Sequence, residues 1–458
     1  MCTNRTQEQR SVWSDEKPWS MKPPRLDLVD REQLKAYFQN TWKMSDWLFE
    51  SIIDDQTLYQ NPDPLRHPLI FYLGHTATFY INKLVMSGGL EKGLNPEFEY
   101  LFAQGVDPEK PGDLVKREDW PGVEQVRAYR KEAFEVVANW IDETSFTLPI
   151  TDKDPHWALF MGMEHDRIHF ETSSVLIRQY APELLTRPKG WRYAPANEVQ
   201  PQFQMIRVPG GTVTLGKETG YPTFGWDNEY GQLKVEVKSF EVTKNLTTNM
   251  EYLTFVESGA YQDRAFWSEE GWQWKTDFKA AHPRFWVPTQ SGYGYRAMFD
   301  VLDMPMDWPV EVNCHEALAY CKWKGEGYRL MTEAEFNHIS TPLLSDDDDP
   351  MFHNEFNLDM KYGSPCPVGM LKSASSASGI NDVYGNVWVW LSNDFYSLPG
   401  FKTHHLYENF SQPYLDDRHA MMLGGAWATM GTGASRFYRL WFRRGFYQHA
   451  GFRMARDL

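Results

Sequence analysis

Residues 164–169 read Glu-His-Asp-Arg-Ile-His, and the fold prediction starts from this run. The run lies in a segment that keeps a helical pattern of apolar residues from Asp154 to about Tyr180. His165 and His169 are four positions apart, so on a helix they share a face and lie one turn apart. The spacing therefore predicts that two imidazoles of one helix can reach the same metal ion.

Three further helices are predicted before this one. Apolar residues recur at helical spacing in two stretches, and Pro68 is suited to the first turn of a third helix. The predicted helical ranges are 29–53, 67–86 and 121–143, with a charged loop containing glycine and proline over about 88–122. Four long helices predict an antiparallel bundle over residues 29–186, preceded by an N-terminal arm over residues 1–28.

A third ligand for the metal has to come from another helix. His75 lies in the middle of a mostly apolar predicted helix, and bundle cores assemble metal sites from facing helices. The residues alone leave alternatives open, because histidines at these spacings also occur on surfaces or as hydrogen-bonded core residues. Three nitrogen ligands suit zinc, copper or Fe(II). The 164–169 run lacks the glutamate that follows the first histidine of HExxH zincins, so a metalloprotease would lack its general base.

The chain changes character after about residue 190. Residues 187–203 are predicted to be a linker, and residues 204–458 a loop-rich α+β domain. The expected elements are a hairpin-like stretch over 205–215, a strand over 234–243, helices over 249–258 and 313–324, and short buried strands over 388–390 and 421–427. The predicted fold class is thus a four-helix bundle followed by an α+β domain.

The composition excludes several classes of protein. A net charge of −16 argues against nucleic acid or an anionic membrane as the main partner. The four cysteines are too few for a disulfide framework in 458 residues. No run of apolar residues is long enough to predict a membrane span, and the N-terminal sequence has no apolar signal core. We therefore expect a cytoplasmic protein whose main partner is neither nucleic acid nor a membrane.

Two groups of residues resemble a known family. Residues 68–75 together with residues 164–169 resemble the DinB-type bundle of the sulfoxide synthases of thiol-histidine biosynthesis. The second domain resembles the formylglycine-generating-enzyme (sulfatase-modifying factor) fold, a variant of the C-type lectin fold. The runs that carry this second resemblance are 208–213, 309–313, 317–323, 329–335, 382–388, 423–427 and 451–453. Together the two resemblances cover nearly the whole chain.

Within that family the chain most resembles the ovothiol branch, the 5-histidylcysteine sulfoxide synthases, through residues 168–178, 224–230 and 306–310. The resemblance implies that Fe(II) held by His75, His165 and His169 couples cysteine to the imidazole carbon of histidine with O2. Ile168, a candidate substrate contact, stands where the ergothioneine branch generally carries glutamine, which disfavours trimethylhistidine as substrate. An ergothioneine-type enzyme acting on trimethylhistidine stays an alternative, as does a DinB-type metal-dependent thiol transferase or hydrolase.

The resemblance also implies roles for residues of the second domain. Tyr396 matches the tyrosine of the family that supplies a proton or a hydrogen atom. Arg439, Arg443 and Arg444 align with the substrate-binding tail of the family and would orient an amino-acid carboxylate. The sequence shows no glycine-rich motif suited to S-adenosylmethionine, so we expect no methyltransferase domain. The sequence predicts no oligomeric state.

Overall fold

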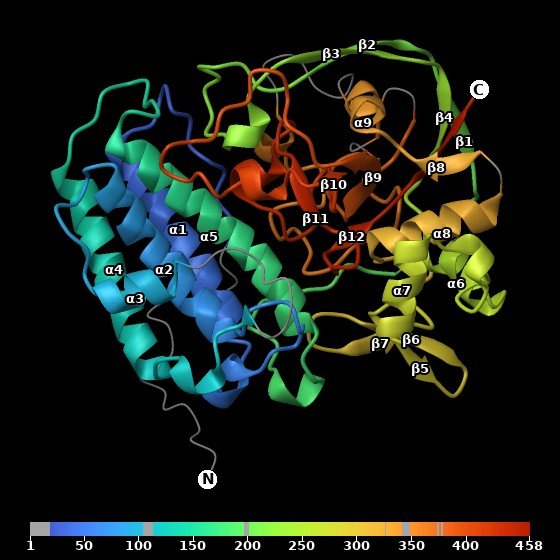
Figure 1. Ribbon diagram of the computed structural model, residues 1–458, viewed down its shortest axis with the longest axis horizontal. Coiled ribbons are helices and arrows are strands. Elements are labelled where there is room, and N and C mark those ends of the chain that lie inside the picture. The colour runs from blue at the N-terminus through green and yellow to red at the C-terminus, as the bar shows by residue number, and fades with distance from the viewer. Residues whose placement is uncertain are drawn as a thin grey trace. The chain divides into compact units, whose positions relative to one another are not determined.

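The computed structural model describes residues 19–103, 113–196, 201–325, 327–340, 349–372, 375–376 and 379–458. The chain divides into two units. The first contains Met1–Trp191 together with Gly220–Phe224 and His405–Tyr407, and the second contains the remaining residues. Helices dominate the first unit, whereas the second combines helices with sheets (Figure 1). The predicted fold class is therefore confirmed.

The first unit is built from four long helices that pack against one another (Figure 1). They are α1 (Arg31–Phe49), α2 (Leu69–Met86), α4 (Val123–Glu143) and α5 (Pro155–Arg178), each within a few residues of its predicted range. The short helix α3 (Pro96–Leu101) corrects the prediction, because a loop is expected there from the sequence. Its 6 residues are too few to show helical periodicity, although Asn95 caps it and a proline opens it.

Local signals explain where the bundle helices begin. Asp30 and the residue three positions further on form a reciprocal capping box at the start of α1. Asp154 caps α5 by accepting a hydrogen bond from a backbone N–H of the first turn. After its first residue, α5 is buried throughout except at Ile168 and His169. Solvent therefore reaches this helix at the position where two of the candidate site residues lie.

The second unit contains four sheets and four helices among its described residues. The helices are α6 (Asn249–Glu257), α7 (Glu269–Asp277), α8 (Cys314–Lys324) and α9 (Glu333–Ser340). One four-stranded sheet has the order β1-β4-β13-β8 and the other the order β11-β10-β9-β12. The strands of these sheets are β1 (Met205–Val208), β4 (Phe240–Thr243), β8 (Tyr328–Leu330), β9 (Trp388–Asp394), β10 (His419–Leu423), β11 (Leu440–Arg443), β12 (Ala450–Gly451) and β13 (Met454–Asp457).

Two smaller sheets complete the second unit. One pairs β2 (Gly211–Leu215) with β3 (Leu233–Val237), and the other contains β5 (Trp286–Thr289), β6 (Gly292–Arg296) and β7 (Val301–Asp303). Helices α7 and α9 were not predicted, whereas α6 and α8 lie within one residue of their predicted ranges. Apolar side chains from both four-stranded sheets share one buried core.

The predicted hairpin over residues 205–215 is wrong in its pairing. β1 pairs with β4 and β2 pairs with β3, so the two strands of this stretch do not pair with each other. The register is continuous across both pairs, since Val208 faces Phe240 and Gly211 faces Val237. Residues 205–215 are therefore one arm of a long antiparallel ribbon (Figure 1).

The bend in this ribbon explains the wrong prediction. Pro209-Gly210 has the composition of a hairpin turn, but here it bends one arm instead of reversing the chain. A Cβ atom at Gly210 would lie 2.8 Å from the carbonyl oxygen of Val237, so only glycine allows the two arms to approach at this corner. The same composition suits a bend and a turn, and only the partner strand distinguishes them.

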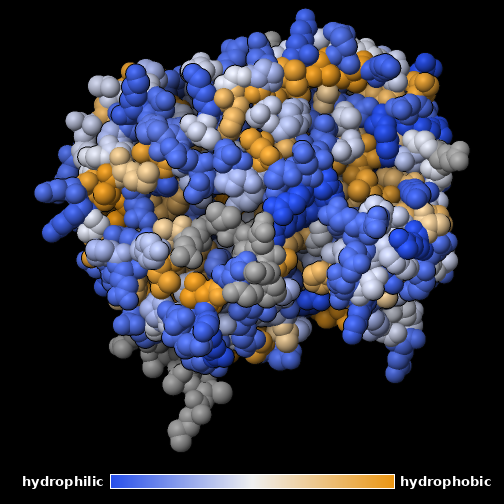
Figure 2. Space-filling view, viewed as in Figure 1, coloured by the Kyte–Doolittle hydropathy of each residue, from blue (hydrophilic) through white to orange (hydrophobic). Residues whose placement is uncertain are grey.

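Hydrophilic and hydrophobic residues are interspersed on the face of the molecule shown in Figure 2. No helix in the described part of the chain is long and apolar enough to cross a membrane. Cys314, Cys321 and Cys366 are free and buried, in keeping with the prediction that the chain has no disulfide framework. Cys2 and residues 1–18 of the predicted arm lie outside the described residues.

Candidate metal centre

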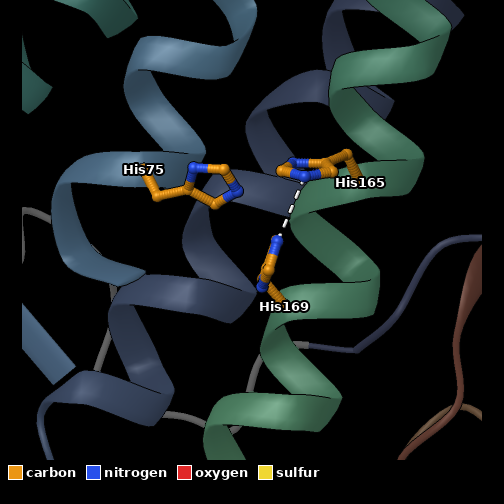
Figure 3. A group of neighbouring side chains, drawn as sticks. All are labelled: His75, His165 and His169. Carbon is orange, nitrogen blue, oxygen red and sulfur yellow. Dashed lines mark hydrogen bonds between the residues drawn. The ribbon is translucent and has the colours of Figure 1, made fainter. Parts of the chain in front are cut away.

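Three histidines lie together inside the bundle of the first unit. His75 comes from α2, and His165 and His169 come from successive turns of α5 (Figure 3). The ring centroid of His75 lies 4.8 Å from that of His165 and 4.7 Å from that of His169. One ring nitrogen of each histidine lies within 4.8 Å of the other two. The structure thus brings together the three residues that the sequence suggests as ligands.

Hydrogen bonds orient the three imidazoles. The Nδ1 atom of His75 lies 2.6 Å from the carbonyl oxygen of Phe102. A carbonyl oxygen only accepts, so Nδ1 carries the proton and Nε2 keeps its lone pair. That Nε2 atom is buried and has no hydrogen-bond partner. The Nε2 atoms of His165 and His169 face each other at 3.1 Å.

This donor set fits a bound metal ion. Two neutral imidazoles that face each other can form at most one hydrogen bond, and the Nε2 atom of His75 forms none. Buried polar atoms without partners destabilise a fold by about 1–3 kcal/mol each. A dication that faces three lone pairs would satisfy them, and imidazole is a ligand of iron, zinc and copper.

Burial keeps the three imidazoles neutral, which is the form that binds metals. Desolvation lowers the pKa of His75 to about 4, although the hydrogen bond to Phe102 opposes this shift. Burial, followed by the proximity of the other histidines, holds the pKa values of His165 and His169 well below their usual range. No proton therefore has to leave these residues at neutral pH before a metal can bind.

Polar contacts to α1 fix the rotation of α5 about its axis. Glu164 accepts a hydrogen bond of 2.7 Å from the hydroxyl of Tyr37. Asp166 accepts one of 2.6 Å from the hydroxyl of Ser45. Because the residues on both sides of His165 are held against α1, the imidazole is directed toward α2.

Aromatic side chains enclose the three histidines. Each imidazole has an aromatic neighbour, and the closest pair is Phe79 stacked on His165 at 3.6 Å between ring centroids, with an angle of 9° between the rings. The other pairs are Phe71 with His75 at 4.7 Å and Tyr72 with His169 at 5.5 Å. These rings shield His75 and His165 from bulk water, leave His169 partly exposed, and limit how far the imidazoles can turn.

Gly162 sets the distance between α2 and α5 near the histidines. A Cβ atom at this position would lie 2.4 Å from the Tyr80 ring. We expect Gly162→Ala to weaken metal binding about tenfold, because the ring or the helices must move. Alanine stabilises a helix by roughly 1 kcal/mol relative to glycine. The clash should destabilise the fold by more than this, so the apparent Tm should fall. Cobalt(II) titration and the apparent Tm measure the two effects.

Gly122→Ala is the matched control for this variant. Gly122 caps α4 with a φ of −63°, and a Cβ atom there would meet only the flexible side chain of Gln125 at 3.3 Å. The control should keep wild-type metal affinity. A Gly162→Ala protein with wild-type cobalt affinity and a raised Tm would contradict the proposed role of this close approach.

Tyr407 is a candidate residue that the sequence did not suggest. Residues 405–407 belong to the first unit, and the Tyr407 ring lies 6.0 Å from the His165 ring and 5.1 Å from the Phe79 ring. Tyr407 follows His404-His-Leu in a segment without regular secondary structure, so no periodic pattern marks it. No local pattern distinguishes it from the other 22 tyrosines of the chain.

Ile168 lies on α5 between the two candidate ligand histidines and is partly exposed. This placement is compatible with the predicted contact to substrate. Tyr396 lies in the second unit, where its ring is 4.8 Å from the guanidinium of Arg439. Burial, together with the neighbouring Glu333 carboxylate, raises the pKa of Tyr396 above its usual range. The role of Tyr396 as a donor stays a prediction.

Arg439 is buried in the second unit and forms a bidentate ion pair. Its Nε and Nη2 atoms donate to the two carboxylate oxygens of Glu333 at 2.7 and 3.0 Å. Its Nη1 atom donates to the backbone carbonyl of Asn228 at 3.0 Å. A substrate carboxylate would have to displace Glu333, so the geometry favours a structural role for Arg439 over the predicted contact with substrate.

Arg443 and Arg444 are half-buried at the end of β11. The Arg443 guanidinium lies 5.6 Å from the Phe446 ring. Arg444 donates to the carboxylate of Asp394 and, at 3.3 Å, to the carbonyl of Asp417. Both residues stay candidates for carboxylate binding, and Arg444 would first have to exchange Asp394 for the substrate.

Comparisons with known proteins place both units. Residues 192–458 match the family model described as sulfatase-modifying factor enzyme 1-like domain, and residues 37–173 match the DinB superfamily. Ergothioneine biosynthesis protein 1 of Schizosaccharomyces pombe is 25% identical over 447 residues, which is 89% of this chain and 53% of that protein. The chain thus spans about half the length of this relative.

Two bacterial relatives match along most of their length. Hercynine oxygenase of Mycolicibacterium smegmatis is 27% identical over 442 residues, covering 88% of this chain and 94% of that protein. Hercynine oxygenase of Mycolicibacterium thermoresistibile is 29% identical over 425 residues, covering 88% of this chain and 91% of that protein. Because the first family model spans more than half of the chain, the chain belongs to the sulfatase-modifying factor enzyme 1-like family, joined here to a DinB superfamily domain as the sequence predicted.

Proposed function

We propose that the chain is an O2-dependent non-heme Fe(II) sulfoxide synthase that couples L-cysteine to the imidazole carbon of L-histidine. The product would be 5-histidylcysteine sulfoxide. The observation that carries the proposal is the cluster of His75, His165 and His169, with His75 and His165 buried and His169 partly exposed, in a DinB-type bundle. The relatives named hercynine oxygenase support an oxidoreductase that acts on a small molecule with O2.

The proposed reaction is balanced in atoms and electrons. A C–H bond of histidine and the S–H bond of cysteine are broken, and a C–S bond and an S=O bond form. These changes remove four electrons from the substrates, and O2 accepts them. One oxygen atom enters the sulfoxide, and the other leaves as water with the two protons released. No further reductant is needed.

The residues of the chain would hold the iron and control protons near it. His75, His165 and His169 would supply three neutral nitrogen ligands, and a ferrous ion bound there would supply a centre that binds thiolate and reduces O2. The aromatic rings around the imidazoles would keep water away from the reacting atoms. The Tyr407 ring carries a hydroxyl group and lies beside His165, which makes Tyr407 a second candidate for the proton donor role that the sequence suggests for Tyr396.

Ile168 bears on which imidazole substrate, histidine or its trimethylated form, accepts the cysteine sulfur. This residue is apolar and lies between the two ligands of α5, where the ergothioneine branch generally carries glutamine. This departure from the pattern of the ergothioneine branch favours histidine over its trimethylated form in this proposal. The relatives named hercynine oxygenase favour the trimethylated form of histidine, which is hercynine. Hercynine is therefore the second candidate for the acceptor.

One experiment separates these reactions. The protein would be loaded with Fe(II) without oxygen and then exposed to O2 with cysteine and either histidine or hercynine, followed by mass analysis. A histidine–cysteine adduct with one added oxygen would support the proposal. If an adduct formed with hercynine alone, hercynine would replace histidine as the proposed acceptor. If cysteine sulfinate were the only product, neither histidine nor hercynine would be the acceptor. Turnover without O2 would point instead to a thiol transferase or hydrolase.

The two candidate tyrosines can be tested against each other. Tyr407→Phe should lower the coupling rate about 100-fold or more, as expected for the loss of a general acid, and should raise the share of cysteine sulfinate. Tyr396→Phe should change neither, since the Tyr396 ring packs against the guanidinium of Arg439, which is already paired with Glu333. The ratio of coupled product to sulfinate is the measurement. The reverse pattern would restore the donor role to Tyr396.

A further inference from the structure

Lys83 is a buried cation on α2 for which the proposed chemistry has no use. It follows His75 by two helical turns and is 8% exposed. Its Nζ atom donates to the backbone carbonyl of Leu406 and lies 3.9 Å from the sulfur of Met86. In the described part of the chain, no carboxylate lies within ion-pair distance of this nitrogen. Burying a charge without a counter-ion is unfavourable, so its surroundings need an explanation.

Two aromatic rings face the ammonium group. Its nitrogen lies 4.4 Å from the centroid of the Tyr407 ring and 5.0 Å from that of the Phe79 ring. Cation–π contacts of desolvated lysines are among the stronger ones, and here they add to a hydrogen bond whose donor is charged. The Leu406 carbonyl and the Tyr407 ring are thus bound by one group, although residues 404–408 have no regular secondary structure of their own.

The two aromatic rings that contact Lys83 also lie beside a histidine of the candidate metal centre. Phe79, which faces Lys83 on one side, stacks on His165 at 3.6 Å between ring centroids. Tyr407 lies 6.0 Å from the same imidazole. We infer that Lys83 is a positioning residue, whose ammonium group fastens residues 405–407 to α2 and so holds the Tyr407 ring beside His165. The inference rests on the proposed function only for its catalytic consequence, since the placement of the segment can be measured without turnover.

The charge state of Lys83 is compatible with this role. Burial lowers the pKa of Lys83 to about 8, so the ammonium form still predominates at pH 7. The charge is also close enough to the site to lower the pKa values of His75 and His165, as a secondary contribution behind burial.

Lys83→Met tests the inference, because methionine keeps an unbranched chain and removes the ammonium group. Hydrogen exchange of a peptide covering residues 401–412 should become at least about tenfold faster, since a charge-assisted hydrogen bond and a desolvated cation–π contact are both lost. Exchange in α2 and α5 and cobalt(II) binding should stay unchanged. Lys83→Arg, which restores a cation, should recover part of the protection. Lys131→Met is the control, since the Lys131 side chain is 80% exposed on α4.

Catalysis supplies a second readout. In the Fe(II) enzyme, Lys83→Met should shift products from coupled sulfoxide toward cysteine sulfinate, in the same direction as Tyr407→Phe. Combining the two substitutions should be no worse than Tyr407→Phe alone, because both act through one ring. Unchanged exchange over residues 401–412, or additive effects of the two substitutions, would overturn the inference. A wild-type protein that forms no coupled product would overturn the proposed function alone, and the exchange result would still decide the placement of the segment.

Discussion

Replacing His165 with leucine should give a folded protein that no longer retains a metal ion. His165 is 2% exposed, and its Nδ1 atom has no hydrogen-bond partner. Leucine fits a buried position beside Phe79, so the metal-free variant should be at least as stable as the metal-free parent. Loss of a hydrogen-bond partner of a metal ligand typically weakens metal binding by roughly 10–100-fold. Loss of a ligand itself should weaken metal binding by more than this. The proposed O2-dependent turnover should disappear with the metal.

Metal content, cobalt(II) absorption and the apparent Tm with and without metal measure these effects. Metal at about 100 times its Kd should stabilise the parent by roughly 2.7 kcal/mol and should leave the variant unchanged. His156→Gln is the matched control on the same helix. His156 is also 2% exposed, but its ring binds Asp154 at 2.8 Å and Thr144 at 3.2 Å.

The control separates loss of the site from loss of the fold. His156→Gln should lower the Tm, because it breaks contacts at the start of α5, and should keep the metal. Stoichiometric cobalt in His165→Leu would remove His165 from the ligand set. Equal loss of metal in both variants would show that the effect is a general weakening of α5.

The helices of the first unit can be predicted from the sequence because apolar periodicity and helix caps are local signals. A long amphipathic segment repeats its apolar residues over many turns, and caps such as Asp30 and Asp154 mark where α1 and α5 begin. The sheets of the second unit depend instead on contacts between distant residues. The sequence predicts a hairpin over residues 205–215 because nothing in this stretch indicates that its partner strands lie within residues 233–243.

The candidate site divides in the same way. Two histidines four positions apart carry a geometric signal within one helix, and His75 could be added because bundle helices face each other. Tyr407 and Lys83 carry no such signal, because their contact joins α2 to a segment more than 300 residues further along the chain. Arg439 shows the opposite limit. Its position in the chain suggests substrate binding, and the sequence does not reveal that its guanidinium is already paired with Glu333.

Arg439→Met should destabilise the second unit by about 3–5 kcal/mol, the usual effect of removing one partner of a buried ion pair. Both side chains of the pair are 3% exposed, so the Glu333 carboxylate would remain buried without its partner. The Asn228 carbonyl would lose a donor as well. A shift in apparent Tm on the order of 10 °C is expected, and scanning calorimetry measures it.

A double-mutant cycle tests the cause of this loss. Glu333→Gln combined with Arg439→Met removes both charges, so it should be less destabilising than the sum of the single substitutions. Arg443→Met is the control, because the guanidinium is half-buried and lies against the Phe446 ring, and it should change the Tm little. If Arg439→Met kept the parental Tm and raised KM for one amino acid alone, Arg439 would be a substrate-binding residue, as the sequence suggested. Loss of stability without that selectivity would assign a structural role to Arg439 and leave Arg443 and Arg444 as the remaining predicted candidates for carboxylate binding.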